Sequence, residues 1–444
     1  MTIPAHRTDR RRFLGSTAAA FAALAASGCV ARGLGSAGAA NSPFGALVPD
    51  PAGILDLPQG FSYRVLSRLG EPMDDGEQVP DRADGMGCFD LGKGRLALVR
   101  NHELSPEPDN LISVGRAFDT AGDSGLALPG GTTTLVLDAE TLAVESQFRS
   151  LAGTIRNCAG GTTPWGSWLT CEENTSTVAE TSGRLKRDHG WVFEVSADAR
   201  GLVEPVPLKA MGRFNHEAAA VDPATGFVYL TEDRDDSLLY RFLPAQPGKL
   251  AAGGRLQALA SEGLADARNW SGTALPVGNE APVRWIDLDD VESPADDLRQ
   301  RGHAKGATLF ARGEGIHMGE GELYFCCTSG GAARQGQVFR VDLRDPGRER
   351  LALFFESTSA AQFSYGDNLC VAPSGHLVVC EDQYGAIVDN YLRGITPDGL
   401  AYPLAHLRLQ TETAGACFSP DGRTMFLNVY QPTMTLAITG PWSV

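Results

Sequence analysis

The chain has 444 residues, of which 43% are hydrophobic and 21% are charged, as in an ordinary folded protein. The formal net charge is −16 and no basic run follows residue 12, so the sequence argues against binding of nucleic acid. The 52 glycines and 26 prolines indicate many turns, and therefore many short strands rather than a few long helices. The acidic surplus either serves solubility or includes carboxylates that bind cations.

Residues 1–40 have the features of an export leader. Arg10-Arg11-Arg12-Phe13-Leu14-Gly15 fits a twin-arginine signal, and the apolar run that follows at 18–26 is too short to span a bilayer. The small residues at 37–40 suit a signal peptidase, whereas Cys29 is compatible with lipoprotein attachment. We therefore predict export by the twin-arginine machinery to the periplasm or beyond, with soluble release favoured over anchoring and no stable membrane span.

Eight of the nine cysteines follow Cys29, and their spacing has no zinc-site pattern of paired CxxC motifs. Some of them can pair in an oxidising compartment, but the spacing does not determine which. Cys326 and Cys327 are adjacent, an arrangement that seldom suits one simple disulfide. We expect the chain to be a monomer.

A short pattern recurs six times along the chain. In each copy a glycine opens a β-rich run that ends in polar or acidic residues, and the copies are residues 94–103, 166–173, 226–233, 321–328, 375–382 and 422–428. Several of these glycines follow a proline, as in Pro373-Ser374-Gly375, which favours a tight turn. Further short strands precede the turns at 216–221, 368–371 and 414–418, so each copy predicts a β-hairpin.

Six hairpins in an all-β chain predict a six-bladed β-propeller. One blade cannot bury both of its faces, whereas a ring of stacked blades buries them and leaves few free edges. The copies are unevenly spaced, so we expect insertions between blades, the largest at 250–297. The predicted propeller domain covers residues 45–444, and a two-sheet sandwich with similar hairpins is the alternative.

Acidic residues stand at the ends of these hairpin strands. The end of one strand and the start of its partner are neighbours in an antiparallel hairpin, and the inner strands of a propeller converge on one mouth of its channel. The residues expected to meet there are Glu103, Cys158, Glu172, Glu173, Glu217, Glu232, Asp233, Glu314, Asp367, Glu381, Asp382 and Glu412. Such a cluster is destabilising unless it binds cations or shares protons. Oxygen ligands suit Ca²⁺, and a thiolate suits a softer transition metal.

Several of these motifs resemble the PhoX family of bacterial alkaline phosphatases. The longest is NCAGGTTPWGSWLTCEE at 157–173, and the others are residues 189–194, 212–217, 231–234, 312–315, 367–370 and 380–382. The resemblance extends from about residue 45 to the C-terminus. It implies a six-bladed propeller that hydrolyses phosphate monoesters with a cluster of Fe³⁺ and Ca²⁺ ions at the propeller mouth.

The resemblance also implies which residues form the site. The implied metal ligands are Cys158, Glu172 or Glu173, Glu217, Glu314, and an acid among Asp367, Glu381 and Asp382. It implies that Arg312 contacts the phosphate and that a polar residue such as Asn101 belongs to the site. Adjacent residues of a strand face opposite sides, so only one of Glu172 and Glu173 is expected to point inward unless the strand has already ended.

The residues also allow structural roles. Arg312 can hold phosphate oxygens with two parallel hydrogen bonds, or it can form a salt bridge with Glu314. Cys158 can be a thiolate ligand or simply a small buried residue. The residue types at these positions therefore leave both readings open.

The leading functional hypothesis is an exported, metal-dependent phosphatase. The sequence has no GxSxG elbow, P-loop or HExxH motif, so other hydrolytic signatures are absent from it. A fold does not determine a function, so two alternatives stand beside it. One is a calcium-dependent lactonase or phosphotriesterase on the same type of propeller, and the other is a non-catalytic metal-binding propeller. Bound iron favours the phosphatase, whereas calcium alone favours the first alternative.

Overall fold

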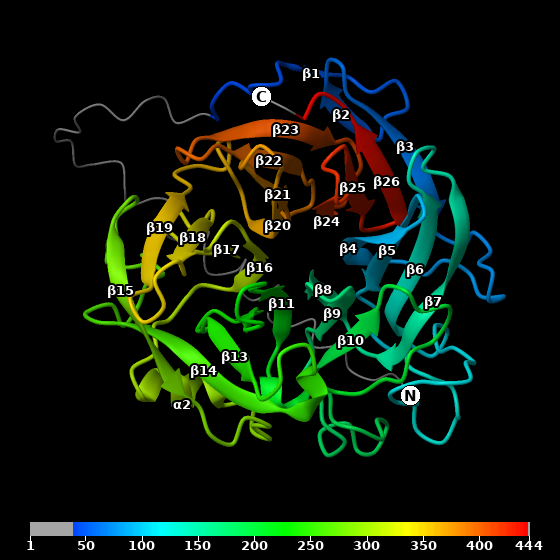
Figure 1. Ribbon diagram of the computed structural model, residues 1–444, viewed down its shortest axis with the longest axis horizontal. Coiled ribbons are helices and arrows are strands. Elements are labelled where there is room, and N and C mark those ends of the chain that lie inside the picture. Colours follow the sequence, from blue (N-terminus) through cyan, green and yellow to red (C-terminus); the bar gives the residue numbers. More distant parts are fainter. Residues whose placement is uncertain (1–38, 443–444) are drawn as a thin grey trace.

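The computed structural model describes residues 39–442, which form an all-β molecule arranged like a propeller around a central axis (Figure 1). The predicted leader up to residue 38, including the candidate attachment site at Cys29, lies outside the described residues. Within residues 39–442 hydrogen bonding groups the strands into five sheets. No helix in this range combines the length and the apolar character needed to cross a membrane.

The first two sheets are formed by consecutive strands. One contains β4 (Ala83–Gly92), β5 (Arg95–His102), β6 (Gly130–Asp138) and β7 (Val144–Thr154), in that order. The other contains β8 (Asn157–Thr162), β9 (Ser167–Glu172) and β10 (Val192–Ser196), with β9 in the centre. Each pairs neighbouring strands antiparallel, as short connections require.

A nine-stranded sheet follows, in the order β11-β12-β13-β14-β15-β19-β18-β17-β16. Its first strands are β11 (His216–Val221), β12 (Val228–Glu232), β13 (Tyr240–Pro244), β14 (Gly254–Ser261) and β15 (Glu280–Asp287). The others are β16 (Gly313–Met318), β17 (Glu322–Cys327), β18 (Gln337–Asp342) and β19 (Arg350–Glu356). Short helices at Lys209–Met211 (η1), Leu250–Ala252 (η2) and Leu298–Ala304 (α2) lie in the connections.

Strands from the two ends of the described chain complete the last two sheets. The six-stranded sheet joins β1 (Leu47–Val48) and β2 (Leu55–Pro58) to β20 (Gly366–Val371), β21 (Leu377–Glu381), β22 (Tyr391–Ile395) and β23 (Ala401–Leu407). The four-stranded sheet joins β3 (Ser62–Arg68) to β24 (Thr413–Phe418), β25 (Thr424–Val429) and β26 (Met434–Thr439). The pairing of β26 with β3 links the end of the chain to its beginning and thereby closes the ring.

All six predicted hairpins are present, as β4–β5, β8–β9, β11–β12, β16–β17, β20–β21 and β24–β25. The sheets surround an axis, so the sandwich alternative is wrong (Figure 1). The six blades expected from sequence are not six separate sheets, because Glu280–Pro282 of β15 pair with β19 and join two groups of strands. The predicted insertion at 250–297 supplies this joining strand, and about a third of it, in β14 and β15, is therefore part of a sheet.

Apolar side chains fill the space between neighbouring sheets. For example, Phe89 of β4 packs in one cluster with Trp168 of β9 and Phe193 of β10. Leu98 of β5 packs in another cluster with Phe426 of β25. The core is therefore a series of layers around the axis, as expected when sheets stack face to face in a ring.

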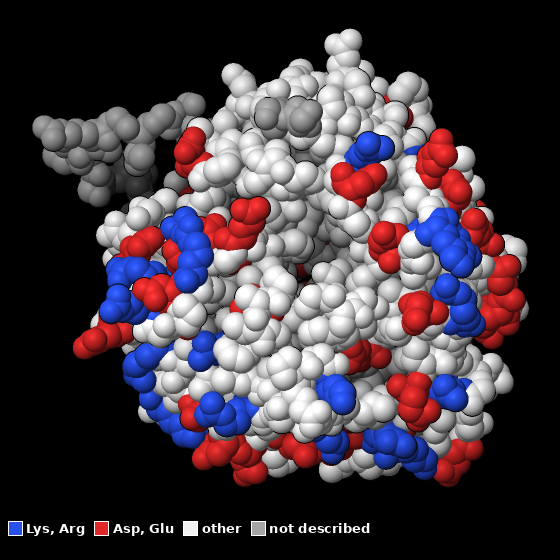
Figure 2. Space-filling view, viewed as in Figure 1, with Lys and Arg blue, Asp and Glu red and all other residues white. Residues whose placement is uncertain are grey.

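The first strand of each hairpin lies nearest the axis (Figure 1). β4 contacts β8, and the contacts continue through β11, β16, β20 and β24 back to β4. Small residues permit this close approach, since a Cβ atom on Gly161 would lie 1.9 Å from the carbonyl oxygen of Ala219. A space-filling view down the same axis shows a hollow at the centre of the ring (Figure 2). The inner strands are thus packed around a narrow axial space.

Each inner strand has the same irregularity near its start. The pairing register shifts there in all six hairpins, for example between Ala83 and Met86 of β4 and between His216 and Ala219 of β11. Such a bulge leaves residues out of the ladder and re-aims their side chains. In five hairpins the second residue of the inner strand lies in this unpaired stretch. This is the feature that positions the site.

Candidate metal centre

Nine carboxylates, a thiol, a guanidinium and a phenol line one pocket on the axis. The residues are Asp84, Glu103, Cys158, Glu173, Glu217, Asp233, Arg312, Glu314, Asp367, Asp382, Tyr384 and Glu412. They come from all six hairpins and their flanking loops, as the repeat predicts. Residues more than 300 positions apart in the chain, such as Asp84 and Glu412, therefore meet in one place.

Two positions of the hairpin supply most of these groups. The second residue of the inner strand supplies Asp84, Cys158, Glu217, Glu314 and Asp367. The residue directly after the partner strand supplies Glu103, Glu173, Asp233 and Asp382. The last hairpin has Ala414 and Tyr430 at these positions, and Glu412, which directly precedes β24, provides its carboxylate instead. The two positions thus supply nine of the twelve pocket residues.

Backbone hydrogen bonds hold the open end of each hairpin in the same way. The amide of Glu103 donates to the carbonyl of Arg82 at 2.9 Å, and the amide of Glu173 donates to that of Arg156 at 2.9 Å. Equivalent bonds occur in the other four hairpins. The residue after the partner strand is therefore fixed beside the start of the inner strand, which brings the two positions that supply the pocket close together.

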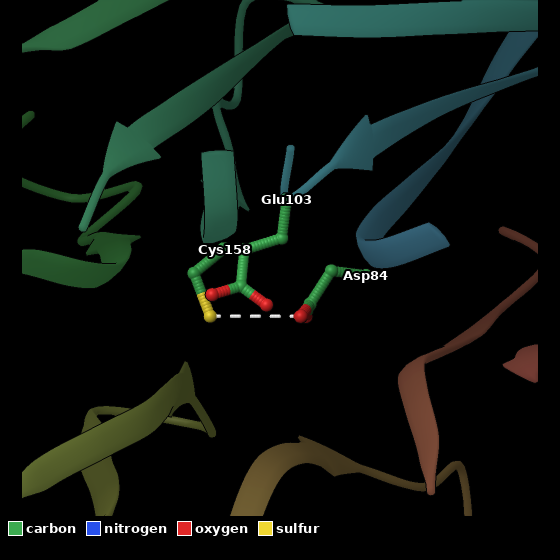
Figure 3. Close-up of side chains that lie close together, drawn as sticks. All are labelled: Asp84, Glu103 and Cys158. Carbon is green, nitrogen blue, oxygen red and sulfur yellow. Dashed lines mark hydrogen bonds between the residues drawn. The ribbon is translucent and has the colours of Figure 1, made fainter. Parts of the chain in front are cut away.

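Cys158 lies among carboxylates from neighbouring hairpins. Its thiol donates to Glu217 Oε1 at 3.1 Å and lies 3.6 Å from Asp84 Oδ2. The side chains of Asp84, Glu103 and Cys158 point toward one another (Figure 3). Burial raises the pKa of the Cys158 thiol, and the charges of Asp84 and Glu217 raise it further. The protein groups alone therefore favour the thiol over the thiolate, and a bound cation would reverse this preference.

The candidate ligands form a continuous row. There are four groups in which three ligand atoms lie within 4.8 Å of one another: Asp84–Glu103–Cys158, Cys158–Glu173–Glu217, Glu217–Glu314–Asp367 and Asp367–Asp382–Glu412. Neighbouring groups share Cys158, Glu217 or Asp367. The row therefore offers positions for several cations side by side. At one end of the row Cys158 provides a sulfur ligand.

The electrostatics of the row fit bound cations. Burial raises the pKa of Asp84, Glu217 and Glu412, and neighbouring carboxylates raise it further. Burial together with Asp382 raises the pKa of Asp367 to about 7. Within the described chain Asp84 Oδ1, Glu217 Oε2 and Glu412 Oε2 are buried without a hydrogen-bond partner. Buried oxygens of this kind suit hard cations such as Ca²⁺, and the thiol suits a transition metal such as iron.

Two arginines partly balance the cluster. Arg312 donates to Asp233 at 2.6 Å and to Glu314 at 2.8 Å, so the salt bridge considered from sequence is present. Its guanidinium also donates to the hydroxyl of Tyr384 at 3.2 Å. Arg156 forms ion pairs with the carboxylates that follow β5 and β9. Arg312 nevertheless lines the pocket, so its guanidinium is available at the same place as the carboxylate row.

Glu172 and Glu381 do not line the pocket. Glu172 lies 2.6 Å from the imidazole of His189 and accepts from the backbone amide of Ile155. Glu381 accepts from Arg393 at 2.8 Å. In both places the strand ends at this glutamate, and the next residue of the chain lines the pocket instead. These two carboxylates therefore belong to the support of the hairpins and are left out of the ligand set.

Asn101 and Glu232 also lie outside the pocket residues. The amide group of Asn101 donates to the backbone carbonyls of Cys158 and Ala159 at 2.9 and 2.8 Å. Glu232 accepts from the hydroxyl of Tyr240 at 2.7 Å. Asn101 therefore holds the strand that carries Cys158 through its backbone.

Sequence reasoning missed two pocket residues, Asp84 and Tyr384. A signal existed for the first, because Ala83-Asp84-Gly85 begins an inner strand in the same way as Gly313-Glu314-Gly315. The hairpin that contains Asp84 was identified only by its second strand. Tyr384 lies in the loop after β21, where no pattern in the sequence distinguishes it.

Fold and site together define a β-propeller-like protein with a pocket of carboxylates and one thiol on its axis. The sequence profile of the family described as alkaline phosphatase PhoX matches residues 42–146 and 138–433. The chain belongs to this family of alkaline phosphatases.

One solved structure agrees with the fold. The chain is similar to Pseudomonas fluorescens PhoX in complex with vanadate, a transition state analogue, with a TM-score of 0.68 and 19% identity over 91% of this chain and 97% of that one. A gluconolactonase from Xanthomonas campestris gives a TM-score of 0.41 and 15% identity over 90% of this chain and 99% of that one. No curated protein has significant sequence similarity to the chain. At these identities the structural likeness concerns the fold alone.

Proposed function

We propose that this protein is an exported, metal-dependent phosphatase that hydrolyses phosphate monoesters. The observation that carries the proposal is the row of buried and half-buried carboxylates and one thiol beside Arg312. Carboxylates alone would repel a phosphate ester, so the row supports this activity only with cations bound. Membership of the alkaline phosphatase PhoX family supports the same reaction.

The proposed cofactors are Fe³⁺ and Ca²⁺. Cys158 would hold iron together with Glu173 and Glu217, because a thiolate suits a transition metal. The oxygen-only groups that contain Asp367 would hold calcium. When bound, such cations neutralise the charge of the phosphate and supply the hydrolytic chemistry.

The protein groups then have separate tasks. Arg312 binds phosphate oxygens through charge-assisted hydrogen bonds, and its pairing with Asp233 and Glu314 fixes the direction of the guanidinium. Arg156 holds the two carboxylates that it bridges, Glu103 and Glu173, in place. Asn101 supports the strand of Cys158 from behind.

We also propose the number of blades, the bounds of the propeller domain and the location of the protein. We count six blades, with β11–β14 and β16–β19 as two blades bridged by β15, and the closed ring of six inner strands supports this count. The propeller domain is residues 45–444, preceded by a twin-arginine leader at 1–40. The mature protein is a monomer in the periplasm or outside the cell, and lipid attachment at Cys29 is the alternative.

Elemental analysis of the purified mature protein, alongside turnover of p-nitrophenyl phosphate with and without chelator, tests the function. We expect iron and calcium in the protein, and loss of turnover in chelator that added metal restores. Calcium without iron, and hydrolysis of lactones or phosphotriesters instead, would favour the first alternative. A fully metal-loaded protein that is inert on many phosphate esters would support the non-catalytic one.

A further inference from the structure

An arrangement of two arginines and a tryptophan lies outside the pocket residues. The guanidinium of Arg268 is 4.3 Å from the ring centre of Trp270, and that of Arg334 is 4.0 Å from it. The indole nitrogen of Trp270 donates to the carbonyl of Ser329 at 2.8 Å. All three side chains are half-buried. We call Arg268, Trp270 and Arg334 the arginine–tryptophan platform.

The platform is attached to the backbone around Arg312. The amide of Thr328 donates to the carbonyl of Arg312 at 3.0 Å, and the next residue, Ser329, holds the indole of Trp270. Residue 334, five positions after Ser329, lies in the same loop between β17 and β18. Trp270 is therefore held by Ser329, the neighbour of Thr328, and Thr328 is hydrogen-bonded to the backbone of Arg312.

A second connection reaches Arg312 from the other side. The amide of Arg312 donates to the carbonyl of Arg234 at 2.9 Å. The next carbonyl, that of Asp235, accepts from the guanidinium of Arg268 at 3.0 Å. Two independent chain segments thus place the platform beside the segment that carries the proposed phosphate-binding arginine.

The loop that carries Arg334 also packs against the wall of the pocket. The carbonyl of Gln335 accepts from the amide of Tyr365 at 2.9 Å. The ring of Tyr365 is 5.5 Å from that of Tyr384, whose hydroxyl accepts from Arg312. The platform is therefore next to the pocket and separate from its lining residues.

The two arginines differ in their partners. Arg268 pairs with both carboxylate oxygens of Asp266, at 2.8 and 2.6 Å. The guanidinium of Arg334, by contrast, has no hydrogen bond or salt bridge to any group among residues 39–442 and is held by its stacking on Trp270. Burial lowers the pKa of Arg334, Asp235 opposes this, and Arg268 lowers it further. A stacked guanidinium with open donors is well suited to bind an anion.

We propose that the arginine–tryptophan platform is a second anion subsite, which binds a further phosphate or carboxylate on the alcohol part of the ester. Arg334 provides the planar pair of donors, and Trp270 holds that guanidinium flat and oriented. The inference rests on the proposed phosphatase function. It assigns a substrate class to the site, namely phosphate monoesters whose leaving alcohol carries a second anionic group.

The test compares Arg334→Gln with the unmodified enzyme, both fully metal-loaded, on three substrates. Fructose 1,6-bisphosphate carries the second anion, whereas fructose 6-phosphate and p-nitrophenyl phosphate lack it. We expect kcat/KM for the bisphosphate to fall about tenfold, mainly through KM, as the loss of one charge-assisted contact implies. For the other two substrates kcat/KM should change less than about twofold, because their phosphate contacts are intact. Arg334→Lys, which keeps the charge, should give an intermediate loss.

Arg348→Gln is the matched control, since this arginine is 83% exposed and lies between β18 and β19. It should leave all three rates unchanged. Equal losses on all three substrates, or no loss on the bisphosphate, would overturn the subsite. If the unmodified enzyme hydrolyses none of them, the proposed function fails. Calorimetric binding of fructose 1,6-bisphosphate to the unmodified protein and to Arg334→Gln then still decides the subsite, since equal affinities would overturn it.

Discussion

The two halves of each inner strand have opposite chemistry. At the start of these strands stand the charged groups of the site, such as Asp84 and Glu217, with their buried carboxylates. A few residues further on, the same strands line a second axial space with small and apolar residues, among them Gly161, Ile316 and Gly415. The β-bulge near the start of each strand separates the two halves. One backbone path can therefore support a cation site and a tightly packed neutral ring, because the first needs charge and the second needs small volume.

The largest expected effect comes from the charged half. Cys158→Ala should lower iron content and phosphatase turnover by more than about 100-fold, since even residues behind a metal ligand often cost up to that much. The far-ultraviolet circular dichroism of the β-rich fold should persist. Cys171→Ala is the matched control, because Cys171 is a buried strand thiol in an apolar cluster and does not line the pocket. Full activity of Cys158→Ala would contradict a metal role for the thiol.

The second prediction concerns the small-residue half. A Cβ on Gly415 would lie 2.4 Å from the carbonyl oxygen of Asp84, at a residue whose φ is 61°. Gly415→Ala should therefore lower the free energy of unfolding by about 3 kcal/mol, from overpacking and backbone strain together. Gly94→Ala, at φ 71° with nothing within 4 Å, carries only the strain and should cost about 1 kcal/mol. Denaturant unfolding measures both free energies. Equal losses would show that the inner strands can accommodate a methyl group at Gly415 without overpacking.

The third prediction separates phosphate binding from metal binding within the charged half. Arg312→Ala should raise the inhibition constant of inorganic phosphate about tenfold, because one charge-assisted contact is lost. Metal content should stay the same, since the carboxylate ligands remain. The inhibition constant of Arg312→Lys should lie between those of the unmodified protein and Arg312→Ala, because lysine keeps the charge and loses the fork of donors. An unchanged inhibition constant would place Arg312 in a purely structural role.

The smallest effect is a pH trend in the metal-free protein. The pKa of Asp367 is raised to about 7 from 3.8, so the folded protein holds this proton more tightly than the unfolded chain. Stability should therefore fall as the pH rises from about 4 to about 7 and stay low above that. Calcium should offset the loss, so the difference in Tm between calcium-loaded and chelated protein should grow by a few degrees across this range. A difference that shrinks with pH would contradict the assignment of the row as a cation site.

Much of the hairpin level could be predicted from sequence, because turns and strands depend on neighbouring residues. The strand at 216–221 coincides with β11, and the runs that begin at Gly226 and Gly375 contain β12 and β21. The pairing of β15 with β19 could not be predicted in the same way. It joins residues about 70 positions apart, and nothing in either segment specifies that contact.

The set of acids could also be predicted, but their directions only in part. Alternation along a strand predicts that only one of Glu172 and Glu173 faces inward, and the structure places Glu173, which directly follows β9, in the pocket. Asp84 was missed because its strand lacks the proline turn that marks other copies. The bulge that exposes it to the axis depends on how the strand pairs with β5.

The sequence by itself determined the hairpins, the recurring acidic positions and the family motifs, since each depends on residues close together in the chain. Only the tertiary structure decided that Glu172 pairs with His189, that Arg312 pairs with Asp233, and that Trp270 stacks with arginines from two segments. The physical reason is closure of the ring. Side chains from distant hairpins become neighbours only when β26 pairs with β3 and the inner strands meet around one axis.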